Sequence, residues 1–142
     1  MARATGRTKE CDDQEARERL ARAREFIEVA DLVVDEKDAQ DFSYVYSSAA
    51  GSLAVLAGIA ASDAACCKAL GHRSRGQNHD EAIGLLERIT PGGKEAAKTL
   101  RALLRLKNQA QYGVFALGGT DLKLLMRQAE RLVAFAEDVL QR

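Results

Sequence analysis

The chain has 142 residues, of which 46% are apolar and 30% are charged, so it can bury a core as one domain without cross-links. It carries 21 basic and 21 acidic side chains, and this zero net charge argues against binding nucleic acid through a general basic excess. The only basic cluster that we recognise lies in residues 1–11, with Arg3, Arg7 and Lys9. We expect residues 1–11 to be a flexible tail rather than a nucleic-acid arm, and residues 12–142 to form a single domain.

The composition predicts an all-α fold. Aromatic residues make up 5% of the chain, Trp is absent, and Pro91 is the only proline. The core must therefore be built from Ala, Leu, Val and Ile, and Ala and Leu are strong helix formers. No clear alternating strand is visible. We predict a five-helix, up-and-down bundle.

The first helix is predicted over residues 13–34. Asp12, with Glu15 three positions later, is typical of a helix start. Spacings of three and four residues predict a packed stripe, which consists of Ala16, Leu20, Ala23, Ile27, Ala30 and Val34. We expect the opposite side to be solvated, and it carries Arg17, Arg22, Arg24 and Glu28.

The second helix is predicted over residues 42–70, with Gly71 as its terminator. Residues 45–62 contain no charge, and a run of this length reaches the lower limit for a membrane-spanning helix. The run is rich in Ala, Gly and Ser, which gain little from hydrocarbon, so we expect a central buried helix and no membrane. Its small residues predict a smooth surface for close helix packing, made of Ala50, Ala54, Ala57, Gly58 and Ala61.

Three shorter predictions complete the bundle. Residues 72–79, "HRSRGQNH", read as a polar loop, and a short third helix follows over residues 79–89. The "TPGG" at residues 90–93 breaks that helix. The fourth helix is predicted over residues 94–111, and the fifth over residues 120–141 with the most regular apolar stripe of the chain.

The cysteines Cys11, Cys66 and Cys67 form a poor disulfide framework. Neighbouring residues on a helix point about 100° apart, so Cys66 and Cys67 suit neither a disulfide between them nor the chelation of a metal. We interpret them as small buried residues of a reducing cytoplasm. The N-terminal residues are charged and contain no apolar run, so we expect no signal peptide and a cytoplasmic location.

The sequence motifs predict neither a metal nor a cofactor. A zinc site needs several Cys or His residues at ligand spacing, whereas His72 and His79 stand apart in a loop. No glycine-rich phosphate loop follows a strand, and no nucleophile elbow is present. Cys66 and Cys67 lie in an apolar helix without an activating cation, so a catalytic thiol is not expected.

Polar residues around the end of the second helix are the first candidates for binding. Arg73 and Arg75 could hold a phosphate or a carboxylate with their planar guanidinium groups, near His79 at the next helix start. The simpler interpretation is a solvated loop. Asp63 is isolated in a long uncharged run, and a buried carboxylate needs a partner. Lys107, Arg73 or Tyr112 could supply that partner.

The polar end of the fourth helix is the second candidate. The apolar stripe of Leu100 and Leu104 continues as Lys107, Asn108 and Tyr112 on the same face. A helix that leaves the core explains such a change equally well, because Lys and Tyr can bury their apolar parts and keep their polar ends wet.

We predict one binding site near one end of the bundle. It would unite Asp63, Arg73, His79, Lys107 and Tyr112. A ligand phosphate would meet the donors Arg73, Arg75 and Lys107.

The order of these elements resembles the HEPN superfamily of small all-helical domains, over about residues 17–140. Three segments carry the resemblance: "FSYVYSSAAGSLAVLAGIAASDAACCKALG", "HRSRGQNHDEAIGLLERI" and "LRALLRLKNQAQYG". Active members of that family carry an Arg, a polar residue and then a His on one helix, and two subunits cleave RNA without a metal. Here Lys107 stands at the Arg position, Asn108 follows it, and Tyr112 stands at the His position.

These replacements resemble the branch of the superfamily that is non-catalytic. Tyr titrates near pH 10 and Lys lacks the planar fork of Arg. The resemblance implies a homodimer with Lys107, Asn108 and Tyr112 at its cleft. It also implies an accessory protein that binds a protein partner, such as a nucleotidyltransferase or a toxin–antitoxin or defence component, or the phosphate of a nucleotide or RNA. The alternative is a metal-independent ribonuclease toxin in which Lys107 and Tyr112 replace Arg and His.

Overall fold

The computed structural model describes residues 8–35, 44–75, 79–112 and 119–142, and it confirms the all-α bundle of five helices. The helices are α1 (Asp13–Asp35), α2 (Tyr44–Leu70), α3 (His79–Glu87), α4 (Gly93–Tyr112) and α5 (Gly119–Leu140). Each helix begins and ends within two residues of its predicted bounds. The agreement follows from stripes of Ala and Leu at helical spacing, because such stripes combine high helix propensity with a face to bury.

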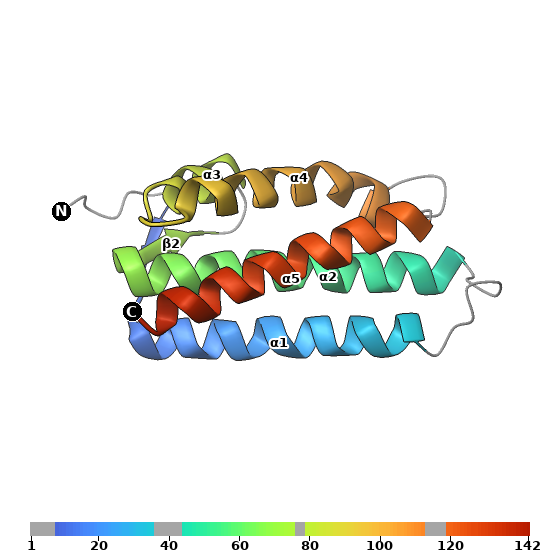
Figure 1. The fold of residues 1–142 in the computed structure, drawn as a ribbon, viewed down its shortest axis with the longest axis horizontal. Coiled ribbons are helices and arrows are strands. Elements are labelled where there is room, and N and C mark those ends of the chain that lie inside the picture. Colours follow the sequence, from blue (N-terminus) through green and yellow to red (C-terminus); the bar gives the residue numbers. More distant parts are fainter. Residues whose placement is uncertain (1–7, 36–43, 76–78, 113–118) are drawn as a thin grey trace.

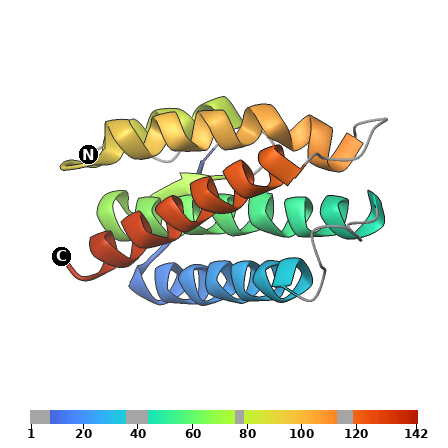
Figure 2. The ribbon, with the colours of Figure 1, turned by 45° about the vertical axis from the view of Figure 1, so that its right-hand side comes forward.

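The helix α2 lies at the centre of the bundle. Figure 1 shows α1 on one side of α2 and α4 on the other, while α5 crosses in front of it. The short α3 packs against α4, and Figure 2 shows the same arrangement after a turn of 45°. The four long helices alternate in direction along the chain (Figure 1). This topology places α1 and α4 on opposite sides of the molecule.

The small residues of α2 allow its neighbours to approach closely, as predicted. Ala50, Ala54, Ala57 and Ala61 are all buried. A methyl group added at Gly58 would lie 2.7 Å from a side-chain carbon of Leu103 in α4, so only glycine fits that crossing without a shift. The segment Ser48–Leu70 is long and apolar enough to cross a membrane by length and composition, but 67% of that window is buried within the bundle. The burial explains the apolar composition of α2 by packing.

Two helix ends follow the sequence signals directly. The Oδ1 atom of Asp12 accepts a hydrogen bond of 2.9 Å from the backbone N–H of Glu15, which caps α1. Gly71 has a φ of 78°, and its N–H donates to the carbonyl of Cys67 at 3.1 Å, which ends α2. Both predicted signals are confirmed.

The chain also forms a small sheet that was not predicted. Strand β1 (Thr8–Glu10) pairs antiparallel with strand β2 (His72–Ser74), in a register that joins Lys9 to Arg73. Residues 8–11 are therefore not part of a flexible tail, and part of the predicted loop 72–79 is a strand. Strands of three residues are too short to show an alternating pattern, which is why the sequence did not reveal them.

Candidate functional site

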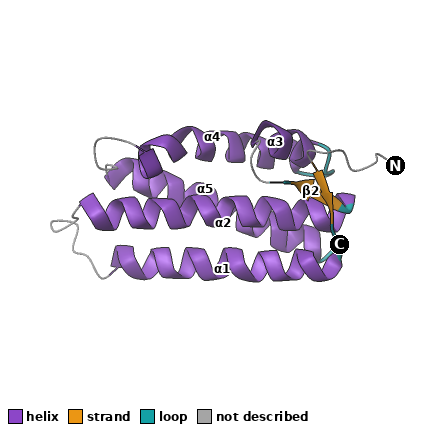
Figure 3. Cartoon of the chain, turned by 180° about the vertical axis from the view of Figure 1, so that it is seen from behind, coloured by secondary structure: helices purple, strands orange, loops and turns teal. Residues whose placement is uncertain are grey.

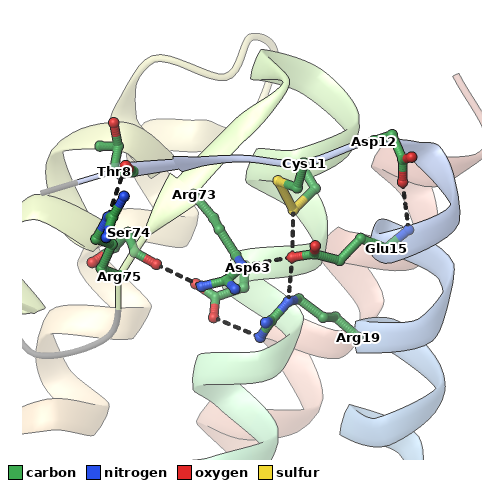
Figure 4. Close-up of polar contacts among 10 residues, drawn as sticks. Thr8, Cys11, Asp12, Glu15, Arg19, Asp63, Arg73, Ser74 and Arg75 are labelled. Atoms are coloured by element: carbon green, nitrogen blue, oxygen red, sulfur yellow. Dashed lines mark hydrogen bonds and ion pairs between the residues drawn. A yellow bond between two sulfur atoms is a disulfide. The ribbon is translucent and has the colours of Figure 1, made fainter. Parts of the chain in front are cut away.

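Four charged side chains from three elements meet beside the small sheet, and we call them the ionic cluster. They are Glu15 and Arg19 of α1, Asp63 of α2 and Arg73 of β2 (Figure 4). The Nε atom of Arg73 donates to Oε2 of Glu15 at 2.7 Å, and Nε of Arg19 donates to the same oxygen at 3.0 Å. Nη1 of Arg19 lies 3.4 Å from Oδ2 of Asp63. Glu15 thus bridges the two arginines.

Local structure explains how each member reaches the ionic cluster. The side chain of Asp12 caps α1 by accepting from the N–H of Glu15, while the carboxylate of Glu15 itself extends to the arginines. Arg19 follows one turn later on the same face, which is the spacing at which helical side chains meet. Arg73 is held by its strand and also donates from Nη1 to the carbonyl of Ser74 at 3.0 Å.

The two carboxylates of the ionic cluster have opposite electrostatic environments. Hydrogen bonds from Arg73 and then Arg19 lower the pKa of Glu15, against the opposing effect of burial. Burial raises the pKa of Asp63 to about 6, although the charges of Arg19 and Arg73 act to lower it and that of Glu15 acts to raise it further. Asp63 therefore changes its charge near neutral pH, whereas Glu15 stays ionised.

A disulfide borders the ionic cluster and corrects our interpretation of the cysteines. Cys11 is bonded to Cys67 across 56 residues of sequence, and their Cα atoms are 5.3 Å apart. The Sγ atom of Cys67 lies 4.0 Å from Oε2 of Glu15 (Figure 4). Cys66 is a free thiol in the core, as predicted, and burial raises its pKa. The neighbouring cysteines were correctly judged unsuited to each other, but the distant pairing was missed.

A second polar group joins α3 to α4. Nζ of Lys107 lies 2.8 Å from Nε2 of His79, and both side chains are partly buried. Burial and then the charge of Lys107 lower the pKa of His79, while Asp80 acts in the opposite direction. The imidazole is therefore neutral at pH 7, and its Nε2 accepts a hydrogen bond from the ammonium group.

The structure brings the predicted site residues together in two groups. Asp63 and Arg73 belong to the ionic cluster, while His79 and Lys107 form their own pair. Arg19, which we had not singled out, is the ion-pair partner of Asp63. The spacing of four between Glu15 and Arg19 was visible in the sequence, but Arg19 was not considered there.

The remaining predicted residues have other roles or lie outside the described part. Arg75 donates from Nε to the carbonyl of Thr8 at 3.2 Å, so it helps to hold β1 against β2. The side chains of Asn108 and Tyr112 lie outside the described residues, although both belong to α4. Arg73 and Arg75 thus make internal contacts in this structure, and neither is a purely solvated loop residue.

A row of basic residues on the outer side of α4 was also missed. Lys94, Lys98, Arg101 and Arg105 follow one another at spacings of four, three and four, and all are exposed. We call them the α4 basic row. The spacing alone places them on one face, over about 16 Å of helix. A count of net charge hides this row, because acidic residues elsewhere balance it.

Comparisons with known proteins give no relative. No protein-family model matches the chain, and no curated protein and no solved structure is significantly similar to it. Nothing in these comparisons links the chain to the HEPN superfamily.

Proposed function

We propose that this chain is a non-enzymatic, HEPN-like accessory protein that binds the phosphates of a nucleotide or RNA along the α4 basic row. The single observation that carries the proposal is the row itself, in which four exposed cations share one helix face. Exposed basic side chains at one-turn spacing attract phosphates and release counterions when they bind. Two of the four have only exposed ion-pair partners, Glu95 for Lys98 and Glu87 for Arg101. Such pairs are weak and are easily exchanged for a ligand phosphate.

The charge distribution supports the same face. Helix α4 contains five basic residues and one acidic residue, whereas α1 contains seven acidic and four basic residues. These helices lie on opposite sides of α2 (Figure 1). Helix α4 is therefore more basic than α1, although α3, which packs against α4, carries Asp80, Glu81 and Glu87. Of the two long helices, α4 is the one to which a polyanion is attracted.

RNA binding and its salt dependence test the proposal. We expect the pair Lys98→Gln and Arg105→Gln to weaken the binding of a fluorescent single-stranded RNA by about tenfold or more at low salt. Each lost contact reduces the slope of log K against log salt by about 0.7, so the double variant should reduce it by about 1.4. The matched control is Arg17→Gln with Arg22→Gln, which removes two exposed cations from α1. Equal losses in both double variants would contradict an α4 site.

A homodimer is the second part of the proposal, and the back of α2 supports it. Ala49, Ser52, Leu53, Leu56 and Ile59 share one face of α2 and are uncharged and partly or fully exposed. Figure 3 shows the bundle from behind, with α2 in front between α1 and α4. A helix that is apolar on all sides is normally covered on all sides. A second copy of the chain is the partner that the HEPN resemblance implies, and a nucleotidyltransferase is a further one.

Sedimentation tests the dimer. We expect the chain to associate at micromolar concentration and Leu56→Glu to shift it to the monomer, because this change puts a charge in the centre of the exposed α2 face. Leu124 of α5 is exposed to a similar extent, so Leu124→Glu is the control and should leave the dimer intact. A wild-type chain that stays monomeric at high concentration would remove this part of the proposal.

The alternative function, a metal-independent ribonuclease, is favoured by one observation. Lys107 has an imidazole beside it after all, because His79 lies 2.8 Å from its ammonium group. If the ammonium group moves from Nε2 to a bound phosphate, it would stabilise the phosphate charge, and the released nitrogen of the neutral imidazole would accept a proton from a ribose 2′-hydroxyl. His79 and Lys107 would take these roles in place of the Tyr112 considered from the sequence.

Incubation of the pure chain with RNA in the presence of EDTA separates the two functions. The accessory function predicts intact RNA for the wild type and for His79→Ala. Cleavage by the wild type that is lost in both His79→Ala and Lys107→Ala would establish the ribonuclease. The variant Lys98→Gln distinguishes binding from cleavage, because it lies in the α4 basic row and not beside His79.

A further inference from the structure

Three potential metal ligands meet where the N-terminal strand joins α1 and α2. The Sγ atoms of Cys11 and Cys67 and a carboxylate oxygen of Glu15 all lie within 4.8 Å of one another. Cys67 is buried, whereas Cys11 and Glu15 are partly exposed, so the group borders solvent. Cys11 and Glu15 come from one turn of chain, and Cys67 comes from the last turns of α2.

We propose that the protein binds a zinc-type divalent cation through Cys11, Cys67 and Glu15 when the disulfide is reduced. Two thiolates, a carboxylate and one water make a tetrahedral set that suits Zn²⁺. Bonds of about 2.3 Å to sulfur and about 2.1 Å to oxygen place the two sulfurs about 3.8 Å apart, and sulfur and oxygen about 3.6 Å apart. The distance of 4.0 Å from Cys67 Sγ to Glu15 Oε2 places this carboxylate beside the sulfur, and because both arginines donate to Oε2, the metal ligand would be the other oxygen, Oε1. After reduction, rotation of the partly exposed Cys11 side chain can increase the distance between the two sulfurs.

The two arginines of the ionic cluster hold the proposed ligand Glu15 in place. Both donate to Oε2, and a carboxylate offers further lone pairs on its other oxygen. Ligating carboxylates are commonly oriented by such outer hydrogen bonds. Two thiolates and Glu15 carry three negative charges, and Arg19 and Arg73 carry two positive charges. The dication therefore enters a group with a net negative charge.

The proposed site is governed by the redox state of the sulfurs. A reductant breaks the Cys11–Cys67 bond with two electrons and leaves two thiols, and the metal then replaces both thiol protons, which pass to solvent. The oxidised form offers no thiolate and cannot bind in this way. A reducing cytoplasm, which we expect for this chain, would hold the form that binds the metal.

Cobalt titration tests the site, with Co²⁺ as a coloured probe for Zn²⁺. The full chain is reduced with a water-soluble trialkylphosphine, which takes up the oxygen of one water molecule to become the phosphine oxide. We expect one equivalent of Co²⁺ to produce the near-ultraviolet thiolate charge-transfer band and the visible bands of a tetrahedral ion. One equivalent of Zn²⁺ should displace it. The oxidised protein should give neither band.

Variants identify the ligands. Cys11→Ser should abolish the charge-transfer band, and Glu15→Gln should weaken binding by about tenfold or more. Cys66→Ala is the control, because Cys66 is a buried thiol outside the ligand group, and it should bind like the wild type. Circular dichroism checks that each variant is folded. No stoichiometric band in the reduced wild type, or the same band in folded Cys11→Ser, would overturn the proposal.

Discussion

The ionic cluster and the α4 basic row use similar residues in opposite ways. In the ionic cluster, Arg73 is 11% exposed at its side chain and makes a contact of 2.7 Å to Glu15. In the α4 basic row, Arg101 is 49% exposed and lies 3.4 Å from Glu87. Burial forces the first arginine to have a fixed partner, because an unpaired buried charge is costly. Water screens the second arginine, so its partner can be exchanged.

This difference separates residues that stabilise the fold from residues that are available to bind a ligand. The ionic cluster joins α1, α2 and β2, and its charges are satisfied within the chain. The α4 basic row faces solvent, and its ion pairs with Glu95 and Glu87 are exposed. Substitutions in the ionic cluster should therefore change stability, and substitutions in the row should change binding. Four predictions test this division, beginning with the largest effect.

The largest loss of stability should come from the disulfide beside the ionic cluster. For the oxidised protein, Cys11→Ser should lower the free energy of unfolding by about 2–4 kcal/mol, because the bond closes a long loop and restricts the unfolded chain. Urea denaturation without a reductant measures the change. Cys66→Ala is the control, and its small effect should persist with and without a reductant. A Cys11→Ser chain as stable as the wild type would mean that the bond does not constrain the unfolded state.

The matched arginines give the next largest difference. Arg73→Met should lower the free energy of unfolding by about 2–3 kcal/mol, since it breaks a mostly buried pair, and the partial exposure of Glu15 reduces the cost. Arg101→Met removes an exposed pair and should cost less than about 1 kcal/mol. Both changes remove one guanidinium and keep an apolar stem. Equal losses in denaturation experiments would contradict the division between the two regions.

The sequence predicted features that depend on neighbouring residues, but it did not predict contacts between residues far apart in the chain. The helices were found because their stripes repeat every three or four residues, and Gly71 marked the end of α2. The pairing of Cys11 with Cys67 joins residues 56 positions apart, and nothing in the sequence favours that pairing over one with Cys66. The choice depends on which face of α2 meets β1, and only the packed structure determines this.

The partners within the candidate sites were also difficult to predict from the sequence. The sequence indicated correctly that Asp63 needs a partner, but three candidates were weighed and Arg73 was only one of them. The direct partner, Arg19, was not among the residues considered from the sequence. The α4 basic row is different, because spacings of four, three and four were visible in the sequence. It was missed because charge had been counted over the whole chain.

The pH dependence of stability should separate the two carboxylates of the ionic cluster. Asp63 has its pKa raised to about 6 in the folded chain, so its contribution to stability is present below pH 3.8 and is lost as the pH rises through 6. Glu15 has a lowered pKa, so its contribution is present above pH 4.5 and is lost as the pH falls through its folded pKa. Asp63 therefore lowers the stability as the pH rises from 3.8 to about 6, and the titration of His79 also contributes near this range.

The variant Asp63→Asn tests that assignment. Relative to the wild type, it should gain stability on the order of 2 kcal/mol as the pH rises from 4 to 8, because the amide carries no charge to bury. Subtracting the two curves cancels the contribution of His79, which titrates in the same range. Asp138→Asn is the control at an exposed site, where the lost ion pair with Arg142 should cost less than about 1 kcal/mol. A flat difference for Asp63→Asn would show that Asp63 is not buried as the structure has it.

The smallest effect concerns a lysine on the inner side of α4. Lys107 contacts His79, whereas Lys98 in the same helix points to solvent in the α4 basic row. Nuclear magnetic resonance titration of the imidazole should give His79 a pKa below its usual value, and Lys107→Met should raise it. The pKa should stay below the usual value, since burial is the larger cause and is still present. Lys98→Met should leave the titration of His79 unchanged. If both lysine variants shifted the pKa of His79 equally, the general charge of α4 would control the imidazole. The contact between Lys107 and His79 would then not define a separate site.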